Sequence, residues 1–451
     1  MNRVAVIGGG LAGLACAAAL GSRGFRVTVL ESRQRLGGRA SSFTDPETGQ
    51  VVDACQHVSM GCCTNLSHFL ETIGVGNLLA AQPKLHFVTP DGLCSVFKAD
   101  PWPAPFHLGR ALTGAHYLTP VEKLRVAWGM LSLLRESPDA DPPLLDWLLA
   151  HRQTPRTIAR FWGVVLVSAL NETVDNLGLK YARKVFRDGF IRHRDGFVVY
   201  VPTVPLSRLY GDELREWFAA HNVEVRENAA VRRVVLSPTS QVIDHLELRD
   251  GSNFTADSYV LAVPFDRVAD VLPEELLDRE PYFGNVRRLS PSPITSVHLW
   301  FDRPVMSLPH AVLVDCLGHW VFNRGEVAAG EFYLQVVVSA ARELRGLGRD
   351  EISRRIVEEL GGVFPPLRAA KLVRAKVVTE HTATFSAVPG VDRWRPTQAS
   401  PLANLAVAGD WTATAWPATM EGAVRSGYLA AEVILARTNQ PERLLQPELG
   451  G

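Results

Sequence analysis

The stretch Val4-Ala5-Val6-Ile7-Gly8-Gly9-Gly10-Leu11-Ala12-Gly13 decides the fold of this 451-residue chain. Its first four residues form a short apolar run, which is typical of a parallel strand buried on both faces. The glycines that follow have the spacing G-x-G-x-x-G. In a dinucleotide-binding turn Gly8 permits the tight bend, Gly10 lets a pyrophosphate approach the backbone, and Gly13 lets the next helix pack closely on the strand.

The residues after this turn complete a β-α-β unit. Leu11 to Ser22 reads as an alanine-rich helix that Gly24 closes, and Arg26 to Leu30 reads as a second strand. The helix N-terminus offers unpaired N–H groups and a partial positive charge to phosphates. Glu31 ends the second strand, where a carboxylate can accept both hydroxyls of an adenosine ribose. The contacts expected here are Gly8, Gly10, Leu11, Ala12, Gly13, Glu31 and Ser32; the alternative is a glycine-rich turn in a fold without nucleotide.

A second glycine pair, Leu36-Gly37-Gly38-Arg39, follows shortly after Glu31 and bears on which dinucleotide is bound. A glycine pair near the pyrophosphate, followed by a fixed cation, suits a long extended cofactor that stays bound through turnover. We therefore predict FAD, held in part by Gly37, Gly38 and Arg39. The alternative is a surface turn with a solvated arginine.

These motifs resemble those of the FAD-dependent amine-oxidase and phytoene-desaturase superfamily, and the C-terminal part of the chain agrees. Ala406 to Asp410 reads as a strand ending in a Gly-Asp pair, and Met420 to Gly427 opens the last long helix. The resemblance implies that Asp410 holds the ribityl-pyrophosphate. It also implies that the helix N-terminus faces the flavin pyrimidine, where its N–H groups would stabilise negative charge on the reduced ring.

The same resemblance assigns further cofactor contacts. Backbone atoms of Val231 would hold the adenine, although plain sheet core is an equal alternative for a single valine. Because residues 409–427 contain no cysteine, we expect the FAD to be bound non-covalently. The contacts implied near the C-terminus are Gly409, Asp410, Ala418, Thr419, Met420, Glu421 and Ala423.

Within the superfamily the chain more closely resembles the hydroxysqualene dehydroxylases. Residues 52–62 resemble their D-N-G-Q-H-x-x-x-G-C segment, residues 168–171 resemble A-A-L-N, and residues 409–423 nearly match their full C-terminal signature. Ala54-Cys55 replaces Asn-Gly, and Trp416 stands where a smaller apolar residue is common. These departures put in doubt any role of positions 54 and 55 and indicate a reshaped substrate pocket.

The resemblance implies a thirty-carbon allylic alcohol, hydroxysqualene, as substrate and squalene as product. A consistent hypothesis is acid-assisted loss of water to an allylic cation, which then receives hydride from reduced flavin. His57 is the first candidate proton donor because an imidazolium donates readily at neutral pH, and Gln56 beside it would position flavin or substrate. Asp53 and Glu172 are reserve candidates, since a carboxyl near apolar walls can stay protonated. A structural role is the alternative for a lone histidine.

Composition excludes several other classes. Lys plus Arg number 47 and Asp plus Glu number 47, so no basic face for nucleic acid is expected. Six cysteines lack the density and spacing of a disulfide framework or a zinc site, and we expect no metal and a reducing, cytoplasmic location. The N-terminal apolar run is broken by glycines and is not expected to be a secretory signal, and no stretch is long enough to span a bilayer.

We predict an α/β fold with a Rossmann-type FAD-binding domain that a mixed α+β substrate domain interrupts. The FAD-binding domain should comprise residues 1–80, 196–270 and 380–438, the substrate domain residues 81–195 and 271–379, and residues 439–451 a frayed tail. In the substrate domain a hairpin is expected at 85–97, and helices at 121–134, 144–149, 156–170, 177–190 and 349–360. Strands are expected at 296–301, 311–314 and 332–338.

Residues 106–134 carry Trp and Leu side chains among Arg and Lys, a pattern that favours contact with the inner face of the cytoplasmic membrane, although core helices look the same. The sequence does not identify the electron donor: a second nicotinamide fingerprint is absent, which leaves a separate protein or free reduced nucleotide as the source of electrons. Two other functions stay open. The first is a flavin desaturase or amine oxidase, which removes hydride from its substrate. The second is a non-catalytic flavin-binding or lipid-carrying protein.

Overall fold

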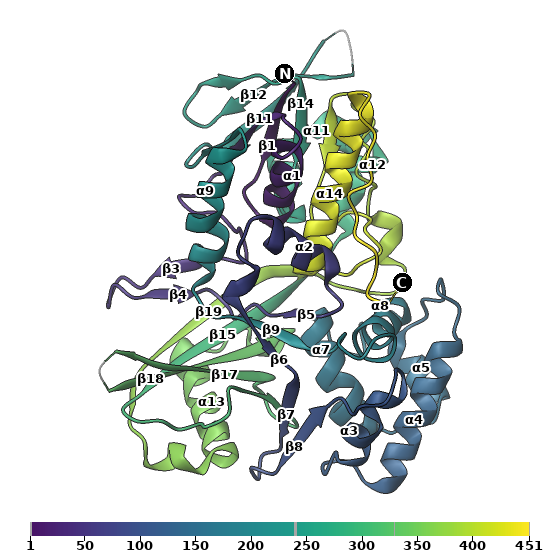
Figure 1. Cartoon of the computed structure of the whole chain (residues 1–451), viewed down its shortest axis with the longest axis vertical. Helices are drawn as coiled ribbons and strands as arrows, with labels where there is room; N and C mark the ends of the chain where they lie inside the picture. Colours follow the sequence, from purple (N-terminus) through teal and green to yellow (C-terminus); the bar gives the residue numbers. More distant parts are fainter. Residues whose placement is uncertain (1, 239–240, 329, 451) are drawn as a thin grey trace.

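The computed structural model describes residues 2–238, 241–328 and 330–450. Figure 1 shows two layered parts: a parallel sheet with its helices near the N-terminus, and a mixed sheet flanked on one side by a group of helices. Three small sheets, β3-β4, β5-β9-β6 and β11-β12-β13, connect and extend these parts. Their strands are β3 (Ser42–Thr44), β4 (Val51–Asp53), β5 (Ser59–Met60), β6 (Leu79–Gln82), β9 (Val199–Pro202), β11 (Val231–Leu236), β12 (Ile243–Leu248) and β13 (Asn253–Phe254).

The predicted β-α-β unit is present and lies in a five-stranded parallel sheet of order β10-β2-β1-β14-β20. These strands are β1 (Arg3–Ile7), β2 (Arg26–Leu30), β10 (Val223–Arg226), β14 (Ser258–Leu261) and β20 (Leu405–Val407). Apart from the exposed Arg3 and Arg26, β1 and β2 are buried along their length, as expected for apolar strands covered on both faces. The sheet thus brings the two ends of the chain and its middle together.

Helices α1 (Leu11–Gly21) and α14 (Met420–Arg437) pack together on this sheet and lie side by side in Figure 1. Every residue of α1 is buried. A Cβ at Gly427 of α14 would lie 2.3 Å from the Ala12 carbonyl oxygen, so this glycine permits the close approach of the two helices. Helices α2 (Thr64–Thr72) and α9 (Glu213–Ala220) also belong to this part.

The mixed sheet has seven strands in the order β19-β15-β18-β17-β16-β7-β8. Helix α13 (Arg349–Val363) packs on one face over Val297, Leu299 and Phe301. The strands are β7 (Lys84–Val88), β8 (Cys94–Lys98), β15 (Pro291–Phe301), β16 (His310–Leu313), β17 (Trp320–Ala328), β18 (Glu331–Ser339) and β19 (Leu372–Phe385). The expected hairpin and three expected strands are therefore present, whereas β17 and β19 were not predicted. Strand β19 runs through residue 380 and β6 through residue 80, so two predicted domain boundaries fall inside strands.

A group of helices lies beside β7 and β8 in Figure 1. Its members are η2 (Phe106–Leu108), α3 (Gly109–Thr113), α4 (Pro120–Arg135), α5 (Leu144–Ala150), α6 (Pro155–Thr157), η3 (Ile158–Gly163), α7 (Val164–Leu170), α8 (Leu179–Phe186) and η4 (Arg187–Ile191). η3 and η4 are π-helical and widen the helices predicted at 156–170 and 177–190. In the described part of the chain, we find no helix that is both apolar enough and long enough to cross a membrane.

The expectation of a frayed tail is wrong. Leu444 is buried, and the backbone N–H groups of Leu444 and Leu445 donate to Glu432 of α14. Farther along, the Glu448 carboxylate pairs with Arg192 at 2.6 Å. The tail is held by these backbone hydrogen bonds and by ion pairs of Glu442 with Arg23 and of Glu448 with Arg192, partners that composition alone does not reveal.

Candidate functional site

The glycine turn between β1 and α1 forms a cradle that fits a pyrophosphate. Gly8 has a φ of +111°, and a Cβ there would lie 2.7 Å from the Ala262 carbonyl oxygen. A Cβ at Gly13 would lie 2.1 Å from the Gly8 oxygen, whereas a Cβ at Gly10 would meet nothing within 4 Å. Gly10 is also the N-cap of α1 and gives no side-chain hydrogen bond, so the first N–H groups of the helix are available. A group can therefore approach the helix N-terminus at Gly10.

The second glycine pair lies against this cradle, as predicted for a cofactor-binding loop. The Gly37 N–H donates to the Gly9 carbonyl at 2.9 Å, and a Cβ at Gly38 would lie 3.1 Å from the Cα of Gly10. Gly37 and Gly38 both have positive φ values, which a side chain would strain. The loop thereby delivers Arg39 to the same site.

Glu31 is buried at the end of β2, beside the glycine turn. One carboxylate oxygen accepts from the Gly9 N–H at 2.7 Å, and the other accepts from the Arg33 N–H at 2.8 Å and the Ser32 hydroxyl at 3.0 Å. The Ala229 N–H donates to the Glu31 carbonyl, which brings the segment leading to Val231 next to this residue. Binding of ribose by Glu31 and Ser32 and of adenine by Val231 stay predictions, and the Val231 side chain packs in the core.

Residues from the two ends of the chain meet at Arg39 and Asp410. Their side chains form an ion pair at 2.6 Å, and Arg39 also donates to the Ala383 carbonyl at the end of β19. Asp410 is buried and follows Gly409, whose φ is +143° and whose N–H donates to Ser426. Arg395, which the sequence did not single out, donates from the buried interior to the carbonyls of Asp410, Thr412 and Trp416. It fixes the loop that leads to α14.

The N-terminus of α14 begins at Met420 after the N-cap Thr419, whose hydroxyl accepts from the Gly422 N–H at 3.0 Å. Ala418 and Glu421 are buried, and Ala423 follows in the same first turn. The Glu421 carboxylate, however, faces α2: it accepts from Asn65 Nδ2 at 2.8 Å and from the Leu66 N–H at 2.7 Å. Burial raises the pKa of Glu421. The predicted cofactor contact at this position therefore rests on its backbone N–H.

The segment Asp53–His57 lies where the two parts of the molecule meet. The Asp53 carboxylate accepts from the Ser42 hydroxyl at 2.7 Å and the Leu206 N–H at 2.9 Å. Arg324 of β17 donates to the Gln56 side-chain oxygen at 2.9 Å and lies 3.9 Å from Asp53. This arginine fixes Asp53 and Gln56 relative to the mixed sheet, and the sequence carried no signal for it.

The surroundings of His57 favour a neutral imidazole. Its Nδ1 lies 3.0 Å from the Cys55 carbonyl oxygen and therefore carries the proton, which leaves Nε2 as an acceptor. Burial lowers the pKa of His57, against a smaller opposing effect of the Cys55 carbonyl. The lowered pKa favours the neutral imidazole at pH 7 and not an imidazolium donor, and the catalytic role of His57 stays a prediction.

Glu172 also differs from the prediction. Arg342 binds both of its oxygens, at 2.5 and 2.7 Å, and the Ser386 hydroxyl and the Thr173 N–H donate to it as well. Burial alone would raise the pKa of Glu172, but these hydrogen bonds together lower it. The carboxyl group is therefore ionised and joins α7 to the mixed sheet, so the expectation of a protonated reserve acid is wrong.

A set of buried polar side chains on the mixed sheet faces the segment Asp53–His57. On β15 and β18 the Gln335 amide donates to Ser296 at 3.0 Å, and His298 Nδ1 lies 2.6 Å from the Tyr333 hydroxyl. The Ser296 hydroxyl also interacts with the Cys55 thiol, whose pKa burial raises to about 12. Burial lowers the pKa of His298 to about 3, so this imidazole is neutral.

Residues 11–435 match the family described as flavin containing amine oxidoreductase. This chain belongs to that family. It is a flavin-dependent oxidoreductase, and the glycine cradle, the open space at Gly10 and the start of α14 fit a flavin dinucleotide.

Curated relatives extend over nearly the whole chain. It is 28% identical to a 15-cis-phytoene desaturase of Synechococcus elongatus, with 98% of this chain and 97% of that protein covered. It is also 28% identical to a hydroxysqualene dehydroxylase of Sinorhizobium fredii, with 97% and 99% covered.

Solved structures confirm the amine-oxidase-like fold. A putrescine oxidase variant superposes with a TM-score of 0.71 at 18% identity, covering 97% of this chain and 99% of its own. Cyclohexylamine oxidase from Brevibacterium oxydans gives a TM-score of 0.68 at 16% identity, with 97% and 99% covered.

Proposed function

We propose that this protein is an FAD-dependent enzyme that reduces hydroxysqualene to squalene. Two features of the chain support this choice over other reactions of the family: the signature at residues 409–423 and the similarity to a hydroxysqualene dehydroxylase over nearly its whole length. Similarity to phytoene desaturases is as high, so the substrate must be argued from the site itself.

The observation that carries the choice of an alcohol over a hydrocarbon is the polar set beside the segment Asp53–His57: the Ser296 hydroxyl interacts with the Cys55 thiol, and His298 interacts with the Ala54 backbone. Within this set Oε1 of Gln335 has no hydrogen-bond partner among the described residues, and it is closed to solvent in this structure. Leaving a buried polar group unpaired costs about 1–3 kcal/mol. A hydrocarbon such as phytoene leaves that cost in place, whereas an allylic alcohol that opens this region can donate its hydroxyl hydrogen to Oε1 of Gln335.

An apolar wall begins at the same segment and suits the rest of a long isoprenoid. Val58 and Met60 pack against a cluster that contains Phe87, Tyr117 and Phe197. Such a wall excludes water, which protects a cationic carbon from recapture by water. A polar end beside an apolar wall fits a molecule with one hydroxyl on a hydrocarbon chain.

The reaction removes a hydroxyl group and adds hydrogen to the same carbon. A proton drawn from solvent adds to the hydroxyl, the C–O bond breaks with both electrons leaving on water, and the carbon then receives a hydride. The conversion therefore consumes one proton and one hydride, which together are two electrons and two protons. Reduced FAD would supply the hydride when bound. His57 is neutral and offers Nε2 as an acceptor, so we assign it the orientation of the hydroxyl or of the departing water, with Gln56 held beside it by Arg324.

Anaerobic oxidation of the reduced holoenzyme tests this proposal. We expect hydroxysqualene to oxidise the bound flavin in a single turnover and to yield squalene, while squalene and phytoene leave the reduced flavin unchanged. Reduction of the oxidised enzyme by phytoene or by an amine would instead establish a desaturase or an amine oxidase. In Gln335→Leu and His298→Leu we expect weaker binding of hydroxysqualene to the oxidised enzyme, measured by the change in the flavin spectrum.

We further infer a cytoplasmic location with access to the membrane that holds the substrate. All six cysteines are unpaired, as suits a reducing compartment. For the electron donor we propose either a separate protein or free reduced nucleotide, since the sequence carries no second nicotinamide fingerprint.

A further inference from the structure

Six large apolar side chains from one short part of the chain are exposed. Phe106 and Leu124 are each 72% exposed, Trp102 62% and Val121 60%. The full set is Trp102, Phe106, Val121, Leu124, Trp128 and Leu131, which we call the apolar patch. Exposed aromatic and leucine side chains that cluster in this way mark a binding surface more often than solitary ones do.

Four members of the patch form a stripe along α4. Val121, Leu124, Trp128 and Leu131 are spaced by three, four and three residues and therefore share one face of the helix. The opposite face, with Val126 and Leu133, is buried. A capping box between Thr119 and Glu122 fixes the start of the helix, so the apolar face points outward from a well-defined helix.

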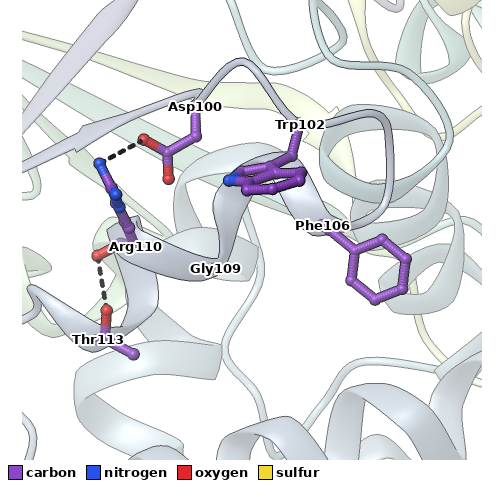
Figure 2. A pocket seen from close by; sticks show the side chains of 6 residues that line it. All are labelled: Asp100, Trp102, Phe106, Gly109, Arg110 and Thr113. Atoms are coloured by element: carbon purple, nitrogen blue, oxygen red, sulfur yellow. Dashed lines mark hydrogen bonds and ion pairs between the residues drawn. The ribbon is translucent and has the colours of Figure 1, made fainter.

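The remaining two members lie on the neighbouring segment, which Figure 2 shows. Trp102 and Phe106 flank a shallow hollow of about 360 Å³, with Arg110 and Thr113 on its other side. The buried Asp100 carboxylate lies 3.8 Å from the Arg110 guanidinium, which is itself largely exposed. Helix α3, which carries Arg110, contacts α4, so the two parts of the patch belong to one region of the surface.

Cations outnumber carboxylates in residues 98–135, which carry the patch, and Glu136 and Asp139 follow directly after α4. Between residues 98 and 135 the cations are Lys98, Arg110, Lys123, Arg125 and Arg135, and the only carboxylates are Asp100 and Glu122. Both carboxylates are buried, and each pairs with an arginine, Asp100 with Arg110 and Glu122 with Arg156. An apolar face with cations beside it complements the surface of an anionic bilayer.

The patch is also continuous with the proposed substrate wall. Leu108 and Leu112, from the segment between Trp102 and α4, pack against the cluster that Val58 and Met60 join. Met130 of α4 contacts the same cluster. The elements that carry the apolar patch on the surface therefore also contribute to the apolar wall in the interior. That wall begins at Val58, next to His57.

We propose that the apolar patch docks on the surface of an anionic lipid bilayer. The stripe of α4 inserts at the level of the headgroups, and Trp102 and Phe106 provide a second anchor. This inference rests on the proposed function, because a thirty-carbon isoprenoid dissolves in the bilayer and must reach the site from there. Insertion of such a face extends about 5–10 Å into the bilayer and needs no spanning helix.

Liposome flotation of the holoenzyme tests this proposal, with vesicles of phosphatidylcholine alone or with about one-third phosphatidylglycerol. We expect the wild type to float with the anionic vesicles and less with the neutral ones. The double variant Leu124→Glu/Trp128→Glu should bind at least tenfold more weakly. Val51→Glu, at an exposed apolar residue of the hairpin β3–β4, is the matched control and should float like the wild type.

Two further measurements keep folding and function separate from docking. The flavin spectrum and thermal unfolding of the double variant should match the wild type, and Trp102→Ala/Phe106→Ala gives an independent test of the second anchor. Hydroxysqualene dissolved in detergent should oxidise the reduced flavin of the double variant at the wild-type rate.

Several outcomes would overturn the proposal: no flotation of the wild type with either lipid, flotation of the double variant like the wild type, or a wild-type dimer that the double variant converts to monomer. The last result would mean that a second copy of the chain covers the patch. If the wild type floats as expected but hydroxysqualene does not oxidise the flavin even in detergent, the result supports docking on the bilayer and contradicts hydroxysqualene as the substrate.

Discussion

The Arg39 guanidinium and the Asp410 carboxylate lie 2.6 Å apart although 371 positions separate them in the sequence. The pair closes the cofactor site, because one partner comes from the loop that lies on the N-terminal glycine cradle and the other from the loop before α14. Asp410 is almost fully buried, so its charge depends on this partner and on the hydrogen bonds around it. Cofactor binding and the joining of the two chain ends are therefore coupled at this position.

Replacing Arg39 with Leu should weaken both properties. The buried Asp410 would lose its partner, and we expect the apoprotein to lose about 2–3 kcal/mol of unfolding free energy and FAD to dissociate at least tenfold more readily. Arg39→Lys should recover part of both losses, since it keeps the charge without the paired hydrogen bonds. Urea unfolding and equilibrium dialysis measure the two effects. Arg33→Leu, at an exposed arginine close by, is the control, and equal effects in the two leucine variants would contradict this account.

The two glycines of the cradle should respond differently to the same substitution. A Cβ at Gly10 meets nothing within 4 Å, so Gly10→Ala should change the unfolding free energy of the apoprotein by less than about 1 kcal/mol while blocking the approach of a pyrophosphate. A Cβ at Gly13 would lie 2.1 Å from the Gly8 oxygen, so Gly13→Ala should destabilise the apoprotein by about 1–3 kcal/mol. Similar unfolding free energies for the two apoproteins would contradict the close contact between Gly13 and the Gly8 carbonyl oxygen.

The β-α-β unit could be predicted because its signals are local: an apolar strand, glycines at fixed spacing and an alanine-rich helix. Strand β19 escaped prediction because Arg374, Lys376 and Glu380 interrupt its apolar residues on a half-exposed strand at the edge of the sheet. The role of Glu421 could not be predicted either, since its carboxylate caps α2 through Asn65, which lies 356 positions away. The polar set that contains His298 and Gln335 could not be predicted from the sequence either. These two residues come from different strands, β15 and β18, which only the fold places opposite each other.

The ion pair between Glu172 and Arg342 should make stability depend on pH. The folded-state pKa of Glu172 lies below its ordinary value of 4.5, so the contribution is present above about pH 4.5 and is lost as the pH falls through the folded-state pKa. Because Arg342 is 35% exposed and partly screened, we expect Glu172→Gln to cost about 2–3 kcal/mol at pH 7 and less at pH 3. The neighbouring exposed Glu343→Gln should change stability by less than about 0.5 kcal/mol. Denaturant unfolding at both pH values provides the measurement, and a cost that does not shrink in acid would show that Glu172 is not ionised.

The neutral state of His57 predicts how the proposed reaction depends on pH. Burial lowers the pKa of this imidazole, so it stays neutral above its ordinary pKa near 6.5 and also for some distance below it. Single-turnover oxidation of the reduced flavin by hydroxysqualene should therefore show no step centred near pH 6.5. His57→Gln should retain part of the rate, because an amide oxygen can replace Nε2 as an acceptor, whereas His57→Leu should slow the step at least tenfold with FAD still bound. A wild-type step near pH 6.5 that disappears in His57→Gln would restore the imidazolium as the proton donor, since only a titrating group at this position produces that difference.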